Sequence, residues 1–170
     1  MVDSSSETCA LRVGVISDTH GLFDPRLETV FAGVDHILHA GDVGAMAVLD
    51  SLAAIAPVTA VRGNVDHEVW AWELPEEAVV VLNGRRLLVA HIKEDLVRRR
   101  DPKSEGFSAV VTGHSHAPAI IQREGVLYLN PGSAGRRRFH HPRAVALLTI
   151  PAAPDGLLQA EIVILEQGSA

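Results

Sequence analysis

The chain has 170 residues, a length typical of one domain, and its 47% hydrophobic content includes only 4% aromatic residues. A formal net charge of −6 argues against nucleic-acid binding through bulk charge, although a local basic patch stays open, and the single cysteine, Cys9, excludes an internal disulfide and favours a cytoplasmic location. No apolar run reaches the roughly 20 residues of a membrane span. Residues 1–10 lack the basic and apolar regions of a signal peptide. We therefore expect a disordered leader over residues 1–10 and a single domain over residues 11–170.

The N-terminal half alternates short apolar strands with short helices. Strands are predicted where β-branched and other apolar residues form short runs, and helices where apolar residues recur every three to four positions. This rule predicts strands around residues 13–16, at 36–39 and at 58–61, and helices at 24–31 and 45–54. Asp24 is the expected cap of the first helix. Short strand–helix–strand connections imply parallel strands with right-handed crossovers.

Beyond Trp72, paired strands replace this alternation. Asn83-Gly84 separates two apolar runs at 78–82 and 85–90, which is a strong hairpin signal. A charged helix at 94–100 and a buried strand at 109–112 follow, and antiparallel strands are predicted at 119–122, 126–129, 144–150 and 157–165. Trp70 and Trp72, just before this change, are expected to pack in the core. The pattern as a whole indicates two sheets packed face to face with helices outside.

Polar side chains follow most of the predicted strands, at the carboxyl ends where α/β sheets bind ligands. The set comprises Asp18, His20, Asp42, Asn64, His91, His114 and His116. Imidazole nitrogens with carboxylate and amide oxygens suit a borderline divalent cation, and seven ligands are too many for one tetrahedral ion. They fit two cations that share a bridging carboxylate, a pair able to clamp both oxygens of a phosphoryl displacement. Gly41, Gly63 and Gly113 each precede a ligand, where a missing side chain lets that ligand turn into a crowded centre.

These motifs, in this order, resemble the signature of the calcineurin-like metallophosphoesterases. The motifs are Asp18-Thr19-His20, Gly41-Asp42, Gly63-Asn64, His91 and Gly113-His114-Ser115-His116. The short chain, the block at 62–66 and the later block at 130–133 resemble the small single-domain phosphodiesterase branch of bacteria and archaea. The resemblance implies an α/β fold, namely a four-layer α/β/β/α sandwich of two mixed sheets flanked by helices. It also implies a dinuclear metal site at the C-terminal ends of the strands.

The resemblance divides the ligands between two ions. The first ion would be held by Asp18, His20 and His116, the second by Asn64, His91 and His114, and Asp42 would bridge them. The implied cofactors are two divalent cations, with Mn²⁺ the first choice and Ni²⁺, Fe²⁺ and Zn²⁺ as alternatives. A hydroxide bridging the two cations would attack the phosphodiester, with His114, Asn64 and Asp42 as the catalytic group.

Two positions depart from the family pattern. Val65 stands where many members have a histidine that protonates the leaving group, although Asp66 is retained beside it. Loss of a general acid typically costs about 10² to 10⁴ in rate, so substrates whose leaving group departs as a stable anion are favoured. His67, His140 and His141 are alternative proton donors.

The second departure is Ile92-Lys93, which follows His91 in place of the usual glycine. Lys93, together with Arg136 in the loop after residues 130–133, is predicted to bind the substrate phosphate, with simple solvation of Arg136 as the alternative.

Two functions of different classes stay open. The first is a metal-dependent phosphodiesterase acting on a small phosphodiester, in preference to a monoesterase. The alternative is a non-catalytic, metal-binding scaffold for protein interactions, resembling the phosphoesterase-like subunit of retromer. Val65 and Ile92 are compatible with the scaffold, whereas the full ligand set favours the enzyme. No membrane partner is expected, and assembly into a homo-oligomer is left open.

Overall fold

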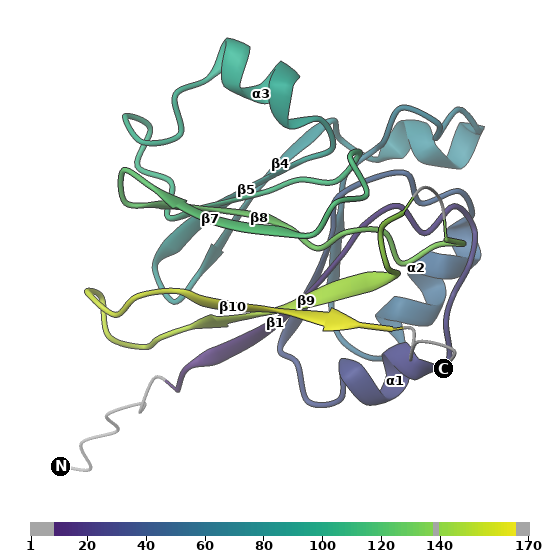
Figure 1. Cartoon of the computed structure of the whole chain (residues 1–170), viewed down its shortest axis with the longest axis horizontal. Coiled ribbons are helices and arrows are strands. Elements are labelled where there is room, and N and C mark those ends of the chain that lie inside the picture. The colour runs from purple at the N-terminus through teal and green to yellow at the C-terminus, as the bar shows by residue number, and fades with distance from the viewer. Residues whose placement is uncertain (1–8, 138–139, 166–170) are drawn as a thin grey trace, which may run out of the picture.

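The structure is a computed structural model that describes residues 9–137 and 140–165. Within these ranges the chain forms two five-stranded mixed sheets with helices on their outer sides (Figure 1). Most of the leader predicted over residues 1–10 lies outside the described residues. Its last two residues, Cys9 and Ala10, are described and are exposed. Among the described residues, no helix combines the length and apolarity needed to cross a bilayer.

The first sheet has the strand order β10-β9-β1-β2-β3. Its strands are β1 (Leu11–Ile16), β2 (His36–His39), β3 (Val58–Ala60), β9 (Ala144–Ile150) and β10 (Gln159–Ile164). β1, β2 and β3 are parallel and are connected by the helices α1 (Arg26–Val30) and α2 (Met46–Ala53), as the alternating pattern predicts. β9 pairs with the other side of β1 in antiparallel fashion, and β10 pairs with β9. The C-terminal hairpin therefore completes the sheet that the N-terminal half begins.

The second sheet has the order β4-β5-β6-β8-β7. Its strands are β4 (Glu77–Leu82), β5 (Arg85–Ala90), β6 (Ala109–Val111), β7 (Ala119–Arg123) and β8 (Val126–Asn130). The predicted hairpin joins β4 to β5, and its turn residues Asn83 and Gly84 have φ values of 47° and 72°, as a type I′ turn requires. The helix α3 (Lys93–Arg99) connects β5 to β6, which lies parallel to β5 and β8.

Three apolar clusters account for the layers. Val15 and Val111 belong to the core between the two sheets. Leu27 of α1 and Leu52 of α2 are buried on the outer side of the first sheet, while Leu96 of α3 is buried on the outer side of the second. Figure 1 shows α3 on one side of the molecule and α1 and α2 on the other. The α/β/β/α sandwich expected from the sequence is confirmed.

The start of α1 differs slightly from the prediction. The helix begins at Arg26, and the backbone N–H of Arg26 donates to Asp24 Oδ1 at 3.0 Å. The Asp24 carboxylate also pairs with the guanidinium groups of Arg26 and Arg143, at 2.6 and 2.8 Å. The hydrogen bond from Arg26 lowers the pKa of Asp24 most, so this buried carboxylate stays charged and fastens α1 to β9.

The segment before β4 contains a short 3₁₀ helix, η1 (Val69–Glu73), that carries both tryptophans. Trp70 is partly buried against the core on the α2 side. The expectation that Trp72 packs in the core is wrong, because 66% of this residue is exposed. A 3₁₀ helix places residues two apart on different sides, so the two rings cannot share one apolar environment.

Candidate metal centre

The seven predicted ligands lie in loops at one edge of the two facing sheets. The first sheet supplies Asp18 and His20 after β1, Asp42 after β2, and Asn64 after β3. The second sheet supplies the histidines His91, His114 and His116, which follow β5 and β6. Because parallel strands end at the same edge, residues far apart in the sequence meet there.

One cluster consists of Asp18, His20 and His116, whose ligand atoms all lie within 4.8 Å of one another. His116 Nε2 lies 3.2 Å from Asp18 Oδ1 and 3.4 Å from His20 Nε2. Asp18 is completely buried, and within the described residues its Oδ1 accepts no hydrogen bond. A buried carboxylate oxygen without a hydrogen bond is costly, and a cation between it and the two imidazoles would remove that cost.

The second cluster is centred on Asn64. Its Oδ1 lies 2.9 Å from His91 Nε2 and 3.0 Å from His114 Nδ1. Asp42 Oδ1 lies 3.3 Å from the same nitrogen of His91, and Asp18, Asp42 and His91 form a further group with ligand atoms within 4.8 Å. Asp42 therefore lies beside members of both clusters. The assignment of individual ligands to two ions stays a prediction.

The contacts of His91 indicate that a positive charge is favoured between its Nε2 atom and the oxygens of Asp42 and Asn64. His91 Nδ1 lies 2.7 Å from the carbonyl oxygen of Ala40, which can only accept, so Nδ1 carries a hydrogen. Nε2 then directs its lone pair at the oxygens of Asp42 and Asn64 unless a proton or a cation lies between them.

The pKa values of this buried pair follow from the same contact. Burial lowers the pKa of His91, but the hydrogen bond and charge of Asp42 outweigh burial and raise it overall. Burial likewise raises the pKa of Asp42, but the hydrogen bond and charge of His91 keep it below its usual value. A proton on His91 thus takes the place that a divalent cation would take, and the donor set fits such a cation.

Comparison with known proteins agrees with this geometry. The family model of the calcineurin-like phosphoesterase superfamily domain matches residues 11–153. The chain belongs to this superfamily. A probable metallophosphoesterase of Methanocaldococcus jannaschii is 32% identical over 169 residues, covering 91% of this chain and 82% of that protein. Such archaeal relatives confirm the small bacterial and archaeal branch that the sequence resembles.

Solved structures with the same fold include both a phosphodiesterase and Vps29 proteins. An archaeal phosphodiesterase superposes with a TM-score of 0.72 at 20% identity, covering 91% of this chain and 100% of that one. Vps29 from Entamoeba histolytica, solved with Zn²⁺, gives a TM-score of 0.69 at 22% identity and covers 92% of this chain and 100% of its own. At these identities, the likeness establishes the fold of this phosphoesterase domain.

Five of the ligands have a left-handed backbone. The φ angles are 54° at Asp18, 47° at His20, 53° at Asp42, 69° at His114 and 58° at His116. Non-glycine residues avoid this region, at a cost of about 1 to 3 kcal/mol each, and occupy it where the surrounding structure holds them. Backbone hydrogen bonds of 3.0 Å from Asp18 to Gly41 and from His20 to Asp42 connect two of the loops. Folding of this phosphoesterase domain therefore fixes the ligand directions.

The three glycines that precede ligands allow this crowding, as predicted. A Cβ atom on Gly113 would lie 1.9 Å from Ser17 Oγ, and one on Gly63 would lie 2.1 Å from the backbone nitrogen of Asp42. A Cβ atom on Gly41 would lie 2.8 Å from His91 Nδ1. Any side chain at these positions would displace a ligand or the backbone beside it.

Asp66 has a role that sequence reasoning missed. Its buried carboxylate accepts backbone hydrogen bonds from Val43 at 3.1 Å, Gly44 at 2.9 Å and Gly63 at 2.8 Å. These donors come from the loop that carries Asp42 and from the loop that carries Asn64. Asp66 therefore holds the two loops together. Its retention beside Val65 is explained by this contact, without a histidine for it to orient.

His39 joins the first two loops from behind the centre. Its Nδ1 accepts from the backbone N–H of Gly41 at 3.2 Å, and its Nε2 lies 3.0 Å from Thr19 Oγ1. The Thr19 hydroxyl donates to the Val43 carbonyl at 2.8 Å, so His39 Nε2 must be the donor to Thr19. His39 is therefore a neutral imidazole with its hydrogen on Nε2.

We expect His39 to make stability depend on pH. Burial lowers the pKa of this completely buried ring from 6.5 to about 4. As the pH falls, the unfolded chain takes up the proton first, so the stability is complete above about pH 6.5 and is lost progressively toward pH 4. The loss reaches about 2 to 3 kcal/mol at pH 4.5, because each pKa unit corresponds to about 1.4 kcal/mol. Urea unfolding of the full chain in chelator, at pH 7 and pH 4.5, measures it.

The matched variant is His39→Gln, which cannot titrate. Wild type is more stable than the variant at pH 7, and we expect this difference to shrink by about 2 to 3 kcal/mol at pH 4.5. A difference that is the same at both pH values would show that His39 does not titrate as described.

The loop after β8 braces the centre from the opposite side. Asn130 Nδ2 donates to the Gly113 carbonyl at 2.8 Å, and Ser133 Oγ donates to the Asp18 carbonyl at 3.0 Å. Both residues belong to the block at 130–133 that resembles the family pattern. Their side chains hold the backbone of the loops that carry Asp18 and His114.

Lys93 and Arg136 are the two predicted substrate contacts. Lys93 Nζ lies 5.3 Å from the centroid of the Tyr128 ring and lines a different cavity from the one beside Asn64 and His91. Arg136 is exposed, next to Gly135, whose N–H donates to the Asp18 carbonyl. A substrate role for Lys93 and Arg136 therefore stays a prediction.

The alternative proton donors are also exposed, namely His67, His140 and His141. Val65 is 44% exposed, and its backbone N–H donates to Asp42 Oδ1 at 3.0 Å. The chain thus places an aliphatic side chain where related enzymes are expected to have an acid.

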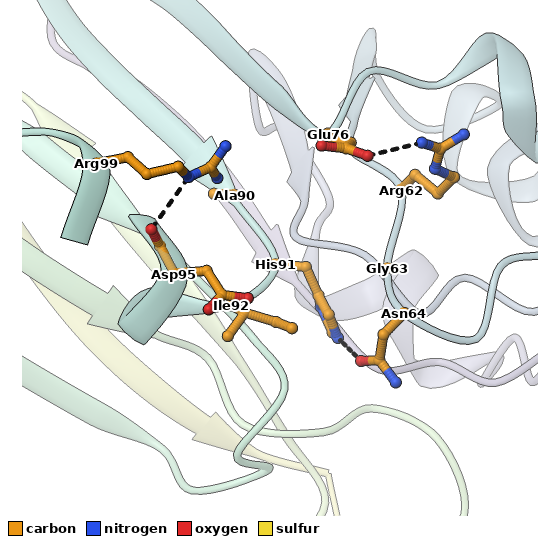
Figure 2. Close-up of a pocket in the computed structure, with 9 residues that line it drawn as sticks. All are labelled: Arg62, Gly63, Asn64, Glu76, Ala90, His91, Ile92, Asp95 and Arg99. Atoms are coloured by element: carbon orange, nitrogen blue, oxygen red, sulfur yellow. Dashed lines mark hydrogen bonds and ion pairs between the residues drawn. The ribbon is translucent and has the colours of Figure 1, made fainter. Parts of the chain in front are cut away.

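A cavity of about 220 Å³ opens beside Asn64 and His91. Figure 2 shows Arg62 and Glu76 on one side of it and Asp95 and Arg99 on the other. Sequence reasoning gave none of these four residues a role in the site. Arg62 directly precedes the Gly63-Asn64 motif, which is the one signal that could have identified it.

Proposed function

We propose that this protein is a metal-dependent phosphodiesterase that hydrolyses a small phosphodiester with the help of two divalent cations, with Mn²⁺ as the first choice. The observation that carries the proposal is the orientation of acceptor atoms from buried Asp42, buried His91 and Asn64 toward one another. One structural neighbour is an archaeal phosphodiesterase, which supports the same activity. The single cysteine supports a cytoplasmic location.

The protein contributes positioned ligands. Asp18, His20 and His116 would hold one ion, and Asn64, His91 and His114 would hold the other, while Asp42 would contact both. When bound, such ions supply an activated water as the nucleophile near neutral pH and neutralise the charge that develops on phosphorus. The Ala40 carbonyl fixes the ring of His91, so that Nε2 faces Asp42 and Asn64, where it would bind an ion.

Position 65 supports a diester with a good leaving group. Val65 cannot donate a proton, and the Asp66 carboxylate is already bonded to three backbone N–H groups. A leaving group that departs as a stable anion, such as an aryl oxide, needs no proton. Natural substrates with a less stable leaving group would need the proton from solvent or from their own structure.

The test is hydrolysis of an aryl phosphodiester and of the matching monoester by chelated protein to which each divalent ion is added back. We expect metal-restored turnover that is at least about tenfold faster for the diester than for the monoester. Faster monoester turnover would make the protein a monoesterase. Absence of turnover with every metal, despite stoichiometric metal binding, would favour a non-catalytic role.

A protein-binding scaffold is the second candidate. Val65, Val69 and Trp72 are 44%, 75% and 66% exposed and lie close together in the sequence, which makes them candidates for a contact surface. Solved neighbours of the fold also include Vps29. The metal-resolved assay above separates the two candidates, because metal binding without turnover would favour the scaffold.

A further inference from the structure

The cavity shown in Figure 2 shares two of its walls with the second ligand cluster. Asn64 and His91 line the cavity, and the same side chains contact each other at 2.9 Å within the cluster. A phosphoester held at the cluster can therefore extend one substituent into the cavity. The residues around the cavity then determine which substituents are accepted.

Two arginines supply most of the hydrogen-bond donors around the cavity. Arg62 Nη2 donates to Glu76 at 2.9 Å, and Arg99 donates to Glu77 at 2.8 Å and to the Asp95 carbonyl at 3.2 Å. Within the described part of the chain, these bonds use one donor of Arg62 and two of Arg99. A guanidinium group has five donors, so both arginines keep the capacity to bind a further acceptor.

The acidic partner of Arg62 can be exchanged at little cost. The Glu76 side chain is 71% exposed, whereas that of Arg62 is 29% exposed. An exposed ion pair contributes little to stability, and the freed Glu76 carboxylate would be solvated. An anionic group entering the cavity can therefore replace Glu76 as the partner of the more enclosed guanidinium.

The lining and size of the cavity narrow the ligand further. Among the described residues that line the cavity, only Ala90 and Ile92 have apolar side chains, so an aliphatic substituent would find little apolar surface to contact. A volume of about 220 Å³ is below the roughly 300 to 1,000 Å³ of sites that enclose a whole drug-sized ligand. The cavity suits one short, polar substituent.

We infer that the preferred substrate is a phosphodiester with a second anionic group, a carboxylate or a phosphate, on one short substituent, and that Arg62 and Arg99 bind this group. The inference rests on the proposed phosphodiesterase function. Guanidinium groups recognise carboxylate and phosphate through paired, charge-assisted hydrogen bonds, which gives both affinity and orientation. The site would thus distinguish diesters by the charge on the substituent that is not the leaving group.

The test uses three 4-nitrophenyl phosphodiesters that differ only in the second substituent: 2-carboxyethyl, 2-phosphoethyl and the neutral 2-carbamoylethyl. We expect kcat/KM to be at least about tenfold higher for one or both charged substrates, the size of one charge-assisted hydrogen bond. The better charged substrate identifies carboxylate or phosphate as the recognised group. Calorimetry with 2-carboxyethylphosphonate, 2-phosphoethylphosphonate and 2-carbamoylethylphosphonate, on metal-loaded protein, gives a readout that is independent of turnover.

Arg62→Ala and Arg99→Ala should each reduce the preference, measured as the ratio of kcat/KM for the better charged substrate to kcat/KM for the neutral one, at least about threefold. Arg98→Ala is the matched control, because Arg98 lies on the same helix, has a side chain 78% exposed and does not line the cavity. The inference is overturned if wild type treats the charged and neutral probes alike, or if the preference survives both cavity variants.

Failure of the proposed function gives a different result. If none of the three diesters is hydrolysed but the charged phosphonates bind in an Arg62-dependent manner, the diesterase proposal fails and the anion site stands. If diesters are hydrolysed without charge preference, the anion site fails and the diesterase proposal stands.

Discussion

Asp42→Ala is expected to abolish metal-dependent hydrolysis of an aryl phosphodiester, lowering kcat/KM by at least about 10³-fold. The physical reason is that Asp42 lies beside members of both ligand clusters, so that its loss would weaken both proposed metal sites together. Metal ions contribute several kcal/mol of charge stabilisation in such reactions, and each 1.4 kcal/mol corresponds to about tenfold in rate. Metal analysis of the dialysed protein should show fewer than two ions per chain.

Two variants separate this loss from a folding defect. Asp42→Asn keeps the shape of the side chain and tolerates the left-handed backbone at this position, but it removes the negative charge, and we expect a loss nearly as large. Asp50→Ala, at an exposed acid on α2, should leave activity within about twofold of wild type. Turnover of Asp42→Ala within tenfold of wild type would contradict a two-ion mechanism.

Gly113→Ala is expected to destabilise the fold by at least about 2 to 3 kcal/mol and to weaken metal binding. The added methyl group would lie 1.9 Å from Ser17 Oγ and 2.7 Å from Asp18 Oδ2, where the two side chains already share a hydrogen bond of 2.6 Å. Overpacking of this kind typically costs about 1 to 3 kcal/mol and sometimes more. At about 2 to 4 °C per kcal/mol for a chain of this size, the melting temperature should fall by roughly 5 to 10 °C.

Gly125→Ala is the comparison variant for this measurement. Gly125 lies in the β7–β8 turn with φ of 85° and has nothing within 4 Å of the position of a Cβ atom. The substitution Gly125→Ala therefore causes no clash, at a position far from Asp18 in the sequence. Its only cost is the left-handed backbone of alanine, about 1 to 2 kcal/mol. Gly125→Ala should keep its metal content. If Gly113→Ala also keeps two ions and wild-type stability, the crowding described for the centre is incorrect.

The sequence predicted the elements because their signals are local. The β-branched run of β1, the turn at Asn83-Gly84 and the spacing of apolar residues in α2 each favour one conformation within a few residues. The positions of the ligands after the strands were predictable for the same reason. The family motifs added the expectation that the strands belong to two mixed sheets, which pairing of β9 with β1 confirms.

Features that depend on contacts between distant segments could not be predicted in this way. Nothing near Asp66 in the sequence indicates that its carboxylate binds N–H groups of Val43 and Gly44. The exposure of Trp72 likewise depends on where η1 leaves the core. The partners of Arg62 and Arg99 include Glu76, just before β4, and Glu77, its first residue. Only the folded chain brings the two arginines to one cavity.

The left-handed backbone at five ligand positions has an evolutionary consequence. Glycine, asparagine and aspartate occupy this region at lower cost than β-branched residues do. A descendant of this chain that abandoned metal chemistry but kept its fold would be restricted to such residues at Asp18, His20, Asp42, His114 and His116. Loss of function would then leave a recognisable pattern of small polar residues and glycines, because the loops keep their shape after the ions have ceased to matter.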